Sequence, residues 1–158
     1  MNRRALTYII LVGALFSSAA CSETVGSGEL VSIPQVSFTC AAGNCGGSGS
    51  QNLFRVIYST FGCSNAGTES FNAKRTKTGY LSCTGASCSG STSGAWVDGS
   101  GADTTLIPAD SYTICIVVFR DSTFQGGATS NDAYAEQNVV VNDSSPAFNI
   151  TAFSNGIP

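Results

Sequence analysis

The chain contains no histidine, and only 11% of its 158 residues are charged. Histidine is the usual general base near neutral pH, so its absence excludes Ser-His-Asp and Cys-His catalytic sites. Acidic residues outnumber basic ones, ten to seven, which gives a formal net charge of −3. A chain with this balance lacks the basic surface of a nucleic-acid binder, so no nucleic-acid partner is expected. Three kinds of function are still compatible with this composition: binding, a structural role, and hydrolysis by a pair of carboxylates.

Long hydrophobic runs are also missing, apart from one near the start of the sequence. Arg3 and Arg4 precede an apolar stretch over 6–16, and small residues follow at 17–20. This order is typical of a secretory signal peptide. The stretch is shorter than the about 20 apolar residues that a membrane-spanning helix needs. We therefore expect residues 1–20 to be a signal peptide that is removed on export.

The small residues end at a cysteine. The stretch Ser18-Ala19-Ala20-Cys21 resembles the end of a bacterial lipoprotein signal, and it departs from that family at its first position, where Leu is usual. The resemblance implies that Cys21 carries lipid and anchors the mature protein to a membrane. Because Ser22 rather than Asp follows, it also implies an outer-membrane or cell-surface location. Ordinary cleavage after Ala20, which would give a secreted or periplasmic protein, is the alternative.

Seven cysteines are present, an odd number for an exported protein. If Cys21 carries lipid, six remain to form three disulfides: Cys40, Cys45, Cys63, Cys83, Cys88 and Cys115. Two similar Gly-rich segments, CAAGNCGGS and CTGASCSGS, each contain a closely spaced pair. The favoured pairing therefore closes each short loop and leaves Cys63–Cys115 to join distant parts, although spacing alone does not settle the connectivity. Zinc held by thiolates is an alternative, but the C-x2-C spacing typical of such sites is missing.

Apolar and polar residues alternate over much of the chain, and no helical period is sustained, which predicts half-buried strands. The expected strand regions are 30–40, 52–61, 79–83, 95–97, 111–120, 134–141 and 147–153. Region 30–40 changes phase at Pro34, which predicts an edge strand with a bulge. Region 111–120 is apolar on both faces, as in a central strand covered on both sides. The polar segment 72–78 is expected to be a solvated loop.

Several short strands with Gly- and Ser-rich connections predict an all-β sandwich or barrel. The segment 103–121 (DTTLIPADSYTICIVVFRD), followed by NVVVN and AFNITAF, resembles the small-residue turn, Tyr-Thr pair, hydrophobic strand and Asp of bacterial prealbumin-like and Ig-like modules. The resemblance implies a single antiparallel β-sandwich. We expect a flexible tether over 21–29 and one sandwich domain over 30–158, held together by the disulfides.

Asp98, Ser100 and Asp103 lie within six consecutive residues, DGSGAD. Two carboxylates and a hydroxyl on a Gly-rich loop are oxygen ligands of the kind that Ca²⁺ takes, so these three residues form a candidate metal site. A polar turn is the alternative, since Asp and Gly favour turns for conformational reasons. No cofactor other than calcium is expected.

Trp96 and Tyr80 lie in or beside predicted loops, as do Phe71 and Phe124. Loop aromatics can form a platform that binds sugar or protein, or they can cap the ends of the core. The expected function is a non-enzymatic, lipid-anchored envelope module that binds a protein or polysaccharide or has a structural role. The alternatives are a hydrolase of envelope polymers that uses a carboxylate pair, and a calcium-dependent adhesion module.

Overall fold

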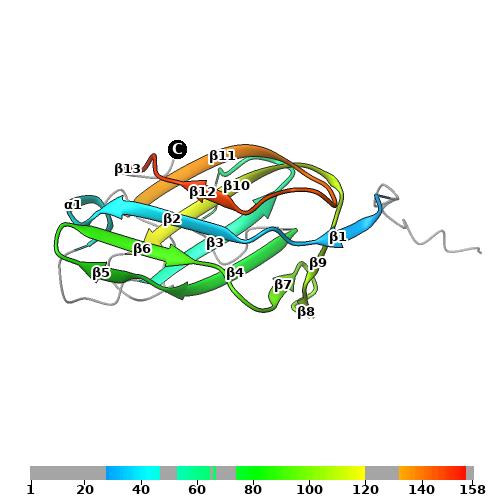
Figure 1. Cartoon of the computed structure of the whole chain (residues 1–158), viewed down its shortest axis with the longest axis horizontal. Helices are drawn as coiled ribbons and strands as arrows, with labels where there is room; N and C mark the ends of the chain where they lie inside the picture. The colour runs from blue at the N-terminus through cyan, green and yellow to red at the C-terminus, as the bar shows by residue number, and fades with distance from the viewer. Residues whose placement is uncertain (1–27, 47–52, 65, 67–73, 120–131, 156–158) are drawn as a thin grey trace, which may run out of the picture.

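A computed structural model of the chain describes residues 28–46, 53–64, 66, 74–119 and 132–155 (Figure 1). Within these ranges the protein consists mostly of β-strands in three open sheets, with one four-residue helix. The predicted signal peptide, Cys21, Phe71 and Phe124 lie outside the described residues. In the part of the chain that the structure describes, no helix is long and apolar enough to cross a membrane.

The largest sheet has seven strands, and each pairs antiparallel with its neighbours. Their order is β13 (Ser154–Asn155), β11 (Ala133–Val141), β10 (Asp110–Phe119), β3 (Leu53–Ser59), β4 (Arg75–Tyr80), β7 (Trp96–Asp98) and β8 (Asp103–Thr104). Strand β10 lies in the interior of the sheet, and its side chains from Ile114 to Phe119 are buried on both faces. The central strand predicted over 111–120 is therefore confirmed.

Two smaller sheets complete the architecture. One has the order β12 (Phe148–Ile150), β2 (Val36–Ala41), β6 (Ser87–Ser91) and β5 (Ser82–Thr84), with β12 parallel to β2 and the other pairs antiparallel. The other is a pair, β1 (Leu30–Ser32) with β9 (Leu106–Pro108). The helix α1 (Ala42–Cys45) directly follows β2.

Two predicted strand regions are divided between sheets. Region 30–40 forms β1 and β2, because Pro34 has no amide hydrogen to continue a ladder and the chain changes sheet there. The chain is thus interrupted at Pro34, where a bulge within one strand was expected. The expected edge position is also wrong for β2, which lies between β12 and β6. Region 79–83 is likewise shared between β4 and β5, which belong to different sheets.

The prediction of a solvated loop over 72–78 is wrong from Arg75 onwards, because β4 begins at that residue. Arg75 Nε donates to the carbonyl oxygen of Leu106, and Lys77 Nζ donates to that of Ala95, each at 2.6 Å. These carbonyl groups take the place of water around the two cations. The charged side chains therefore do not prevent the segment from forming a strand.

The seven-stranded and four-stranded sheets pack against each other through one apolar core. Phe38 of β2 and Phe54 of β3 meet edge to face, with ring centroids 5.0 Å apart. Each ring lies over a glycine directly opposite on a neighbouring strand, Gly90 for Phe38 and Gly79 for Phe54. Because glycine has no Cβ, it leaves room for the ring. The two sheets form two layers, and the four-stranded sheet lies in front of β3 and β10 in Figure 1.

A second apolar cluster covers part of the other face of the seven-stranded sheet, which we call its outer face. It consists of Leu53, Ile57, Cys63, Ala66, Cys115, Val117, Phe119 and Tyr134. The Cys63–Cys115 disulfide ties the chain that follows β3 to the middle of β10. Both faces of the central strands are thereby shielded from water.

Three disulfides are present, with the pairing that the cysteine spacing favours. Cys40–Cys45 and Cys83–Cys88 each join residues five positions apart, and Cys63–Cys115 joins residues 52 positions apart. Disulfides persist in oxidising compartments and are rare in the cytosol of most organisms. Three in a domain of this size are typical of an extracellular environment.

Candidate functional site

Asp98 organises the turn between β7 and β8. Its Oδ1 accepts hydrogen bonds from the Ser100 hydroxyl at 2.7 Å, the Ser100 amide at 2.9 Å and the Ala102 amide at 3.0 Å. The bond from the Ser100 hydroxyl, followed by those from the two amides, holds the pKa of the Asp98 carboxyl below its ordinary value. Gly101 completes the turn with a φ of 87°, a conformation that side chains disfavour.

Asp103 does not converge with this turn. It is paired with Val97, whereas the Asp98 amide bonds to the Ala102 carbonyl at 2.9 Å. Residues directly opposite each other share a face and successive residues alternate, so Asp98 and Asp103 lie on opposite faces of the hairpin. Of the three predicted calcium ligands, Asp98 and Ser100 are therefore in contact, and Asp103 lies apart from them. Among the described residues, no group of three or more acidic or cysteine side chains is placed to hold a metal ion.

The two aromatic residues predicted to form a platform are also separated. Trp96 is only 3% exposed and packs against Tyr58, with ring centroids 5.3 Å apart. Trp96 therefore caps the core, and the prediction that it belongs to an exposed binding platform is wrong. Tyr80 is 62% exposed at the end of β4 and remains available to a partner.

The outer face of β4 carries a row of polar side chains that lead to Tyr80. Thr76 is paired with Ile57, which belongs to the cluster on the outer face. Because side chains alternate along a strand, Thr78 and Tyr80 point to the same side as Thr76. Thr78 is exposed, and Thr76 is half-buried.

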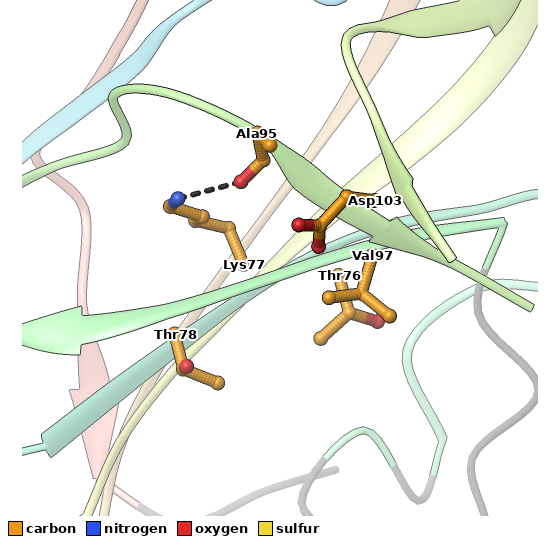
Figure 2. A pocket seen from close by; sticks show the side chains of 6 residues that line it. All are labelled: Thr76, Lys77, Thr78, Ala95, Val97 and Asp103. Atoms are coloured by element: carbon orange, nitrogen blue, oxygen red, sulfur yellow. Dashed lines mark hydrogen bonds between the residues drawn. The ribbon is translucent and has the colours of Figure 1, made fainter. Parts of the chain in front are cut away.

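An open pocket of about 290 Å³ lies on this face (Figure 2). Its lining consists of Thr76, Lys77, Thr78, Ala95, Val97 and Asp103. Thr76, Val97 and Asp103 form one row, because each is paired with the next across β4, β7 and β8. In Figure 2 the Asp103 carboxylate lies beside Val97, and the Lys77 side chain turns away towards the Ala95 carbonyl.

We call Thr76, Thr78, Tyr80, Val97 and Asp103 the β4–β7–β8 face. It combines a phenol, two threonine hydroxyl groups, an apolar side chain that is 40% exposed and one carboxylate. This set can donate and accept hydrogen bonds and can stack against a ligand. Among the described residues that line the pocket, Asp103 is the only acid. Hydrolysis by paired carboxylates has no support there, since that chemistry needs two.

Sequence reasoning identified Tyr80 and Asp103 separately and missed the two threonines between them. The segment 75–80 (RTKTGY) alternates with period two, and this signal would have placed Thr76, Thr78 and Tyr80 on one side of a strand. It was outweighed by the polar composition of the segment.

A second open pocket, of about 360 Å³, lies at the ends of β3, β10 and β11. It is lined by Ser59, Thr60, Ser111, Tyr112, Thr113, Asn138, Val139 and Val140. The Tyr112 hydroxyl donates to the Pro108 carbonyl at 2.8 Å, and burial raises the pKa of this phenol. The described residues of its lining offer hydroxyl and amide groups and no carboxylate, so the β4–β7–β8 face has the wider chemistry.

No protein-family model matches the chain, and neither a curated protein nor a solved structure matches it.

Proposed function

We propose that the protein is an exported, lipid-anchored module of the cell envelope that binds a partner without catalysing a reaction. The use of the cysteines carries this proposal. Disulfides take up six of the seven, and the remaining cysteine is Cys21. It directly follows the small residues at the end of the signal-like segment, where a lipoprotein signal would place its acylated cysteine.

The proposed fold is a single β-sandwich of the Ig-like or prealbumin-like kind. The order β2-β6-β5 matches strands B, E and D of an Ig-like sandwich, and β3-β10-β11 matches C, F and G. The bond from the Tyr112 hydroxyl to the carbonyl four residues earlier resembles the tyrosine corner of such sandwiches. The Cys63–Cys115 disulfide departs from the Ig pattern, because it lies on the outer face rather than between the sheets.

The β4–β7–β8 face is the proposed binding surface, and a neutral polysaccharide of the envelope is the proposed partner. The face presents hydroxyl groups, a carboxylate and an exposed phenol, which suit the hydroxyl groups and the apolar ring faces of sugars. Lys77, which lines the pocket, already donates to the Ala95 carbonyl, so an anionic ligand is less well matched.

Binding to isolated envelope polysaccharide, measured by co-sedimentation, tests the surface. Tyr80→Ala should weaken binding about three- to tenfold, the scale of one lost aromatic contact. Asp103→Asn should weaken it less, because the amide still forms hydrogen bonds. Phe61→Ala removes an aromatic side chain that is 82% exposed outside this face and should leave binding unchanged. Equal losses in the two aromatic variants, or binding only to protein fractions, would contradict the proposal.

Fractionation of cells that express Cys21→Ser tests the anchor separately. The natural chain should be recovered with membranes and released by detergent, because two acyl chains give stable anchoring. The variant should be recovered in the soluble exported fraction or retain its signal peptide. Recovery of both forms in the same soluble fraction would contradict lipid anchoring and leave the binding surface untouched.

A further inference from the structure

The two short disulfides are neighbours in the four-stranded sheet. Cys40 of β2 is directly opposite Cys88 of β6, and Cys88 is directly opposite Cys83 of β5. Three cysteines therefore form one row across three adjacent strands, and opposite residues share a face. Cys45, at the end of α1, is bonded to Cys40 and lies in the same apolar core as Cys40 and Cys88. In Figure 1, α1 lies at the end of the four-stranded sheet where β2 ends.

The strand register places a second cysteine, Cys40, opposite Cys88, besides its disulfide partner Cys83. The Ala42 amide bonds to the Ala86 carbonyl at 2.9 Å, so Ala42 and Ala86 form a hydrogen-bonded pair. Such pairs alternate along a ladder, so Cys40 and Cys88 form the next one, with an expected Cα separation of about 5.5 Å. This lies inside the range of about 4.4 to 6.8 Å that disulfides usually span. The Cα atoms of the existing Cys83–Cys88 pair are 4.0 Å apart.

Exposure differs among the four cysteines. Cys88 and Cys45 are fully buried, and Cys40 is 4% exposed, whereas Cys83 on the edge strand β5 is only partly buried. A thiolate from solution can therefore reach Cys83 more readily than the other three sulfur atoms. The Cys88 sulfur that such an attack would release lies opposite Cys40.

We propose that these four cysteines form a thiol–disulfide exchange site whose substrate is a low-molecular-weight thiol. The external thiolate attacks Cys83 Sγ, forms a mixed disulfide and releases Cys88 as a thiolate. Cys88 Sγ then attacks Cys40 Sγ, the Cys40–Cys45 bond breaks, and Cys45 leaves as a thiolate that takes up a proton. Two disulfides are present before and after, so no other oxidant or reductant is required.

The exchange has a defined structural consequence. It replaces a bond that holds α1 to β2 with one that joins β2 to β6, and it leaves a thiol at Cys45. The external thiol remains attached at Cys83. This site goes beyond the binding role of the β4–β7–β8 face and does not depend on it.

Disulfide mapping of the exported protein after exposure to reduced glutathione tests the proposal, with N-ethylmaleimide to trap thiols. Trypsin should leave Cys40 and Cys45 on a peptide that ends at Arg55, and Cys83, Cys88 and Cys115 on the peptide 78–120, which the Cys63–Cys115 disulfide already joins to the peptide 56–74. We expect the peptide that ends at Arg55 to become joined to this pair, with glutathione on Cys83 and N-ethylmaleimide on Cys45. Labelling of Cys83 and Cys88 with Cys40–Cys45 intact would overturn the proposal, and so would the absence of any exchange.

Two double variants provide a matched comparison. Cys45→Ser with Cys83→Ser leaves Cys40 and Cys88, which should form a disulfide on air oxidation. Cys45→Ser with Cys88→Ser leaves Cys40 and Cys83, which are separated by the whole width of β6 and should stay reduced. Failure of the folded first variant to form its disulfide would overturn the proposal. If the variants do not fold, the mapping of the natural chain decides.

Discussion

Tyr58 joins the two layers through its hydroxyl group. The side chain is fully buried, and the hydroxyl donates to the Pro34 carbonyl at 3.0 Å, where the chain passes from β1 to β2. Burial raises the pKa of this phenol, so it remains a donor at physiological pH. The hydrogen bond gives a partner to the Pro34 carbonyl, which lies between β1 and β2 and outside their strand ladders.

We expect Tyr58→Phe to lower the free energy of unfolding by about 1 to 2 kcal/mol, because the Pro34 carbonyl loses its buried partner. Urea denaturation measures the change. Tyr80→Phe removes the same hydroxyl from a side chain that is 62% exposed and should change stability by less than about 0.5 kcal/mol. Similar losses in the two variants would contradict the role given to the Tyr58 hydroxyl.

Asp98 makes the turn between β7 and β8 sensitive to acid. Its folded-state pKa is lowered by the hydrogen bonds from Ser100 and Ala102, so its stabilising contribution is present above the unfolded-state pKa. That contribution is lost as the pH falls through the folded-state pKa. Asp98→Ala should therefore lower the melting temperature at neutral pH, and the difference from the natural chain should shrink in acid.

The matched control for this titration is Asp98→Asn, which keeps an acceptor for the turn but does not ionise. The melting temperature of this variant should vary less with pH than the melting temperature of the natural chain does. A difference between Asp98→Ala and the natural chain that stays constant from neutral pH into acid would contradict the assignment.

At the scale of elements, the core depends on glycines that face phenylalanines across a ladder. A Cβ at Gly90 would overlap the Phe38 ring, which is packed between Phe54 and Phe153. Gly90→Ala should therefore cost about 1 to 3 kcal/mol of stability, as overpacking does. Gly43→Ala in α1 meets nothing within 4 Å and should be neutral or slightly stabilising. Thermal unfolding of both variants checks this, and an equal response would contradict it.

How far each strand could be predicted depends on the residues that it buries. β10 buries isoleucine and valine on both faces, so its hydropathy pattern identifies it as a central strand. β6 has the sequence SCSGS and buries Cys88 and Gly90. A glycine under an aromatic ring contributes no hydropathy signal, so β6 was not predicted although it pairs with both β2 and β5.

The candidate site was harder to predict because it depends on pairing between distant strands. Asp103 reaches the β4–β7–β8 face through a row that includes Val97 and Thr76, and no local pattern contains this register. The three predicted calcium ligands lie within six residues of each other, but the register of the β7–β8 hairpin places Asp98 and Asp103 on opposite faces.

At the scale of the whole molecule, the disulfides differ in the length of chain that they close. Cys63–Cys115 closes a loop of 52 positions and should contribute about 4 kcal/mol, whereas the five-position loop of Cys40–Cys45 should contribute about 2 kcal/mol in the chain-entropy model. Replacing both members of each pair with alanine, followed by denaturant unfolding, measures the two losses. A larger loss for the short loop would show that this model does not describe the protein.

Lipid anchoring and complete cysteine pairing are the central claims at this scale, and they predict one molecular mass. The measurement is the intact mass of the protein from its native membrane fraction, with and without reduction. We expect the mass of residues 21–158 plus acyl groups, with a gain of two hydrogens for each of the three disulfides on reduction. A mass without acyl groups, or a smaller gain on reduction, would contradict this account of Cys21 and of the cysteine pairing.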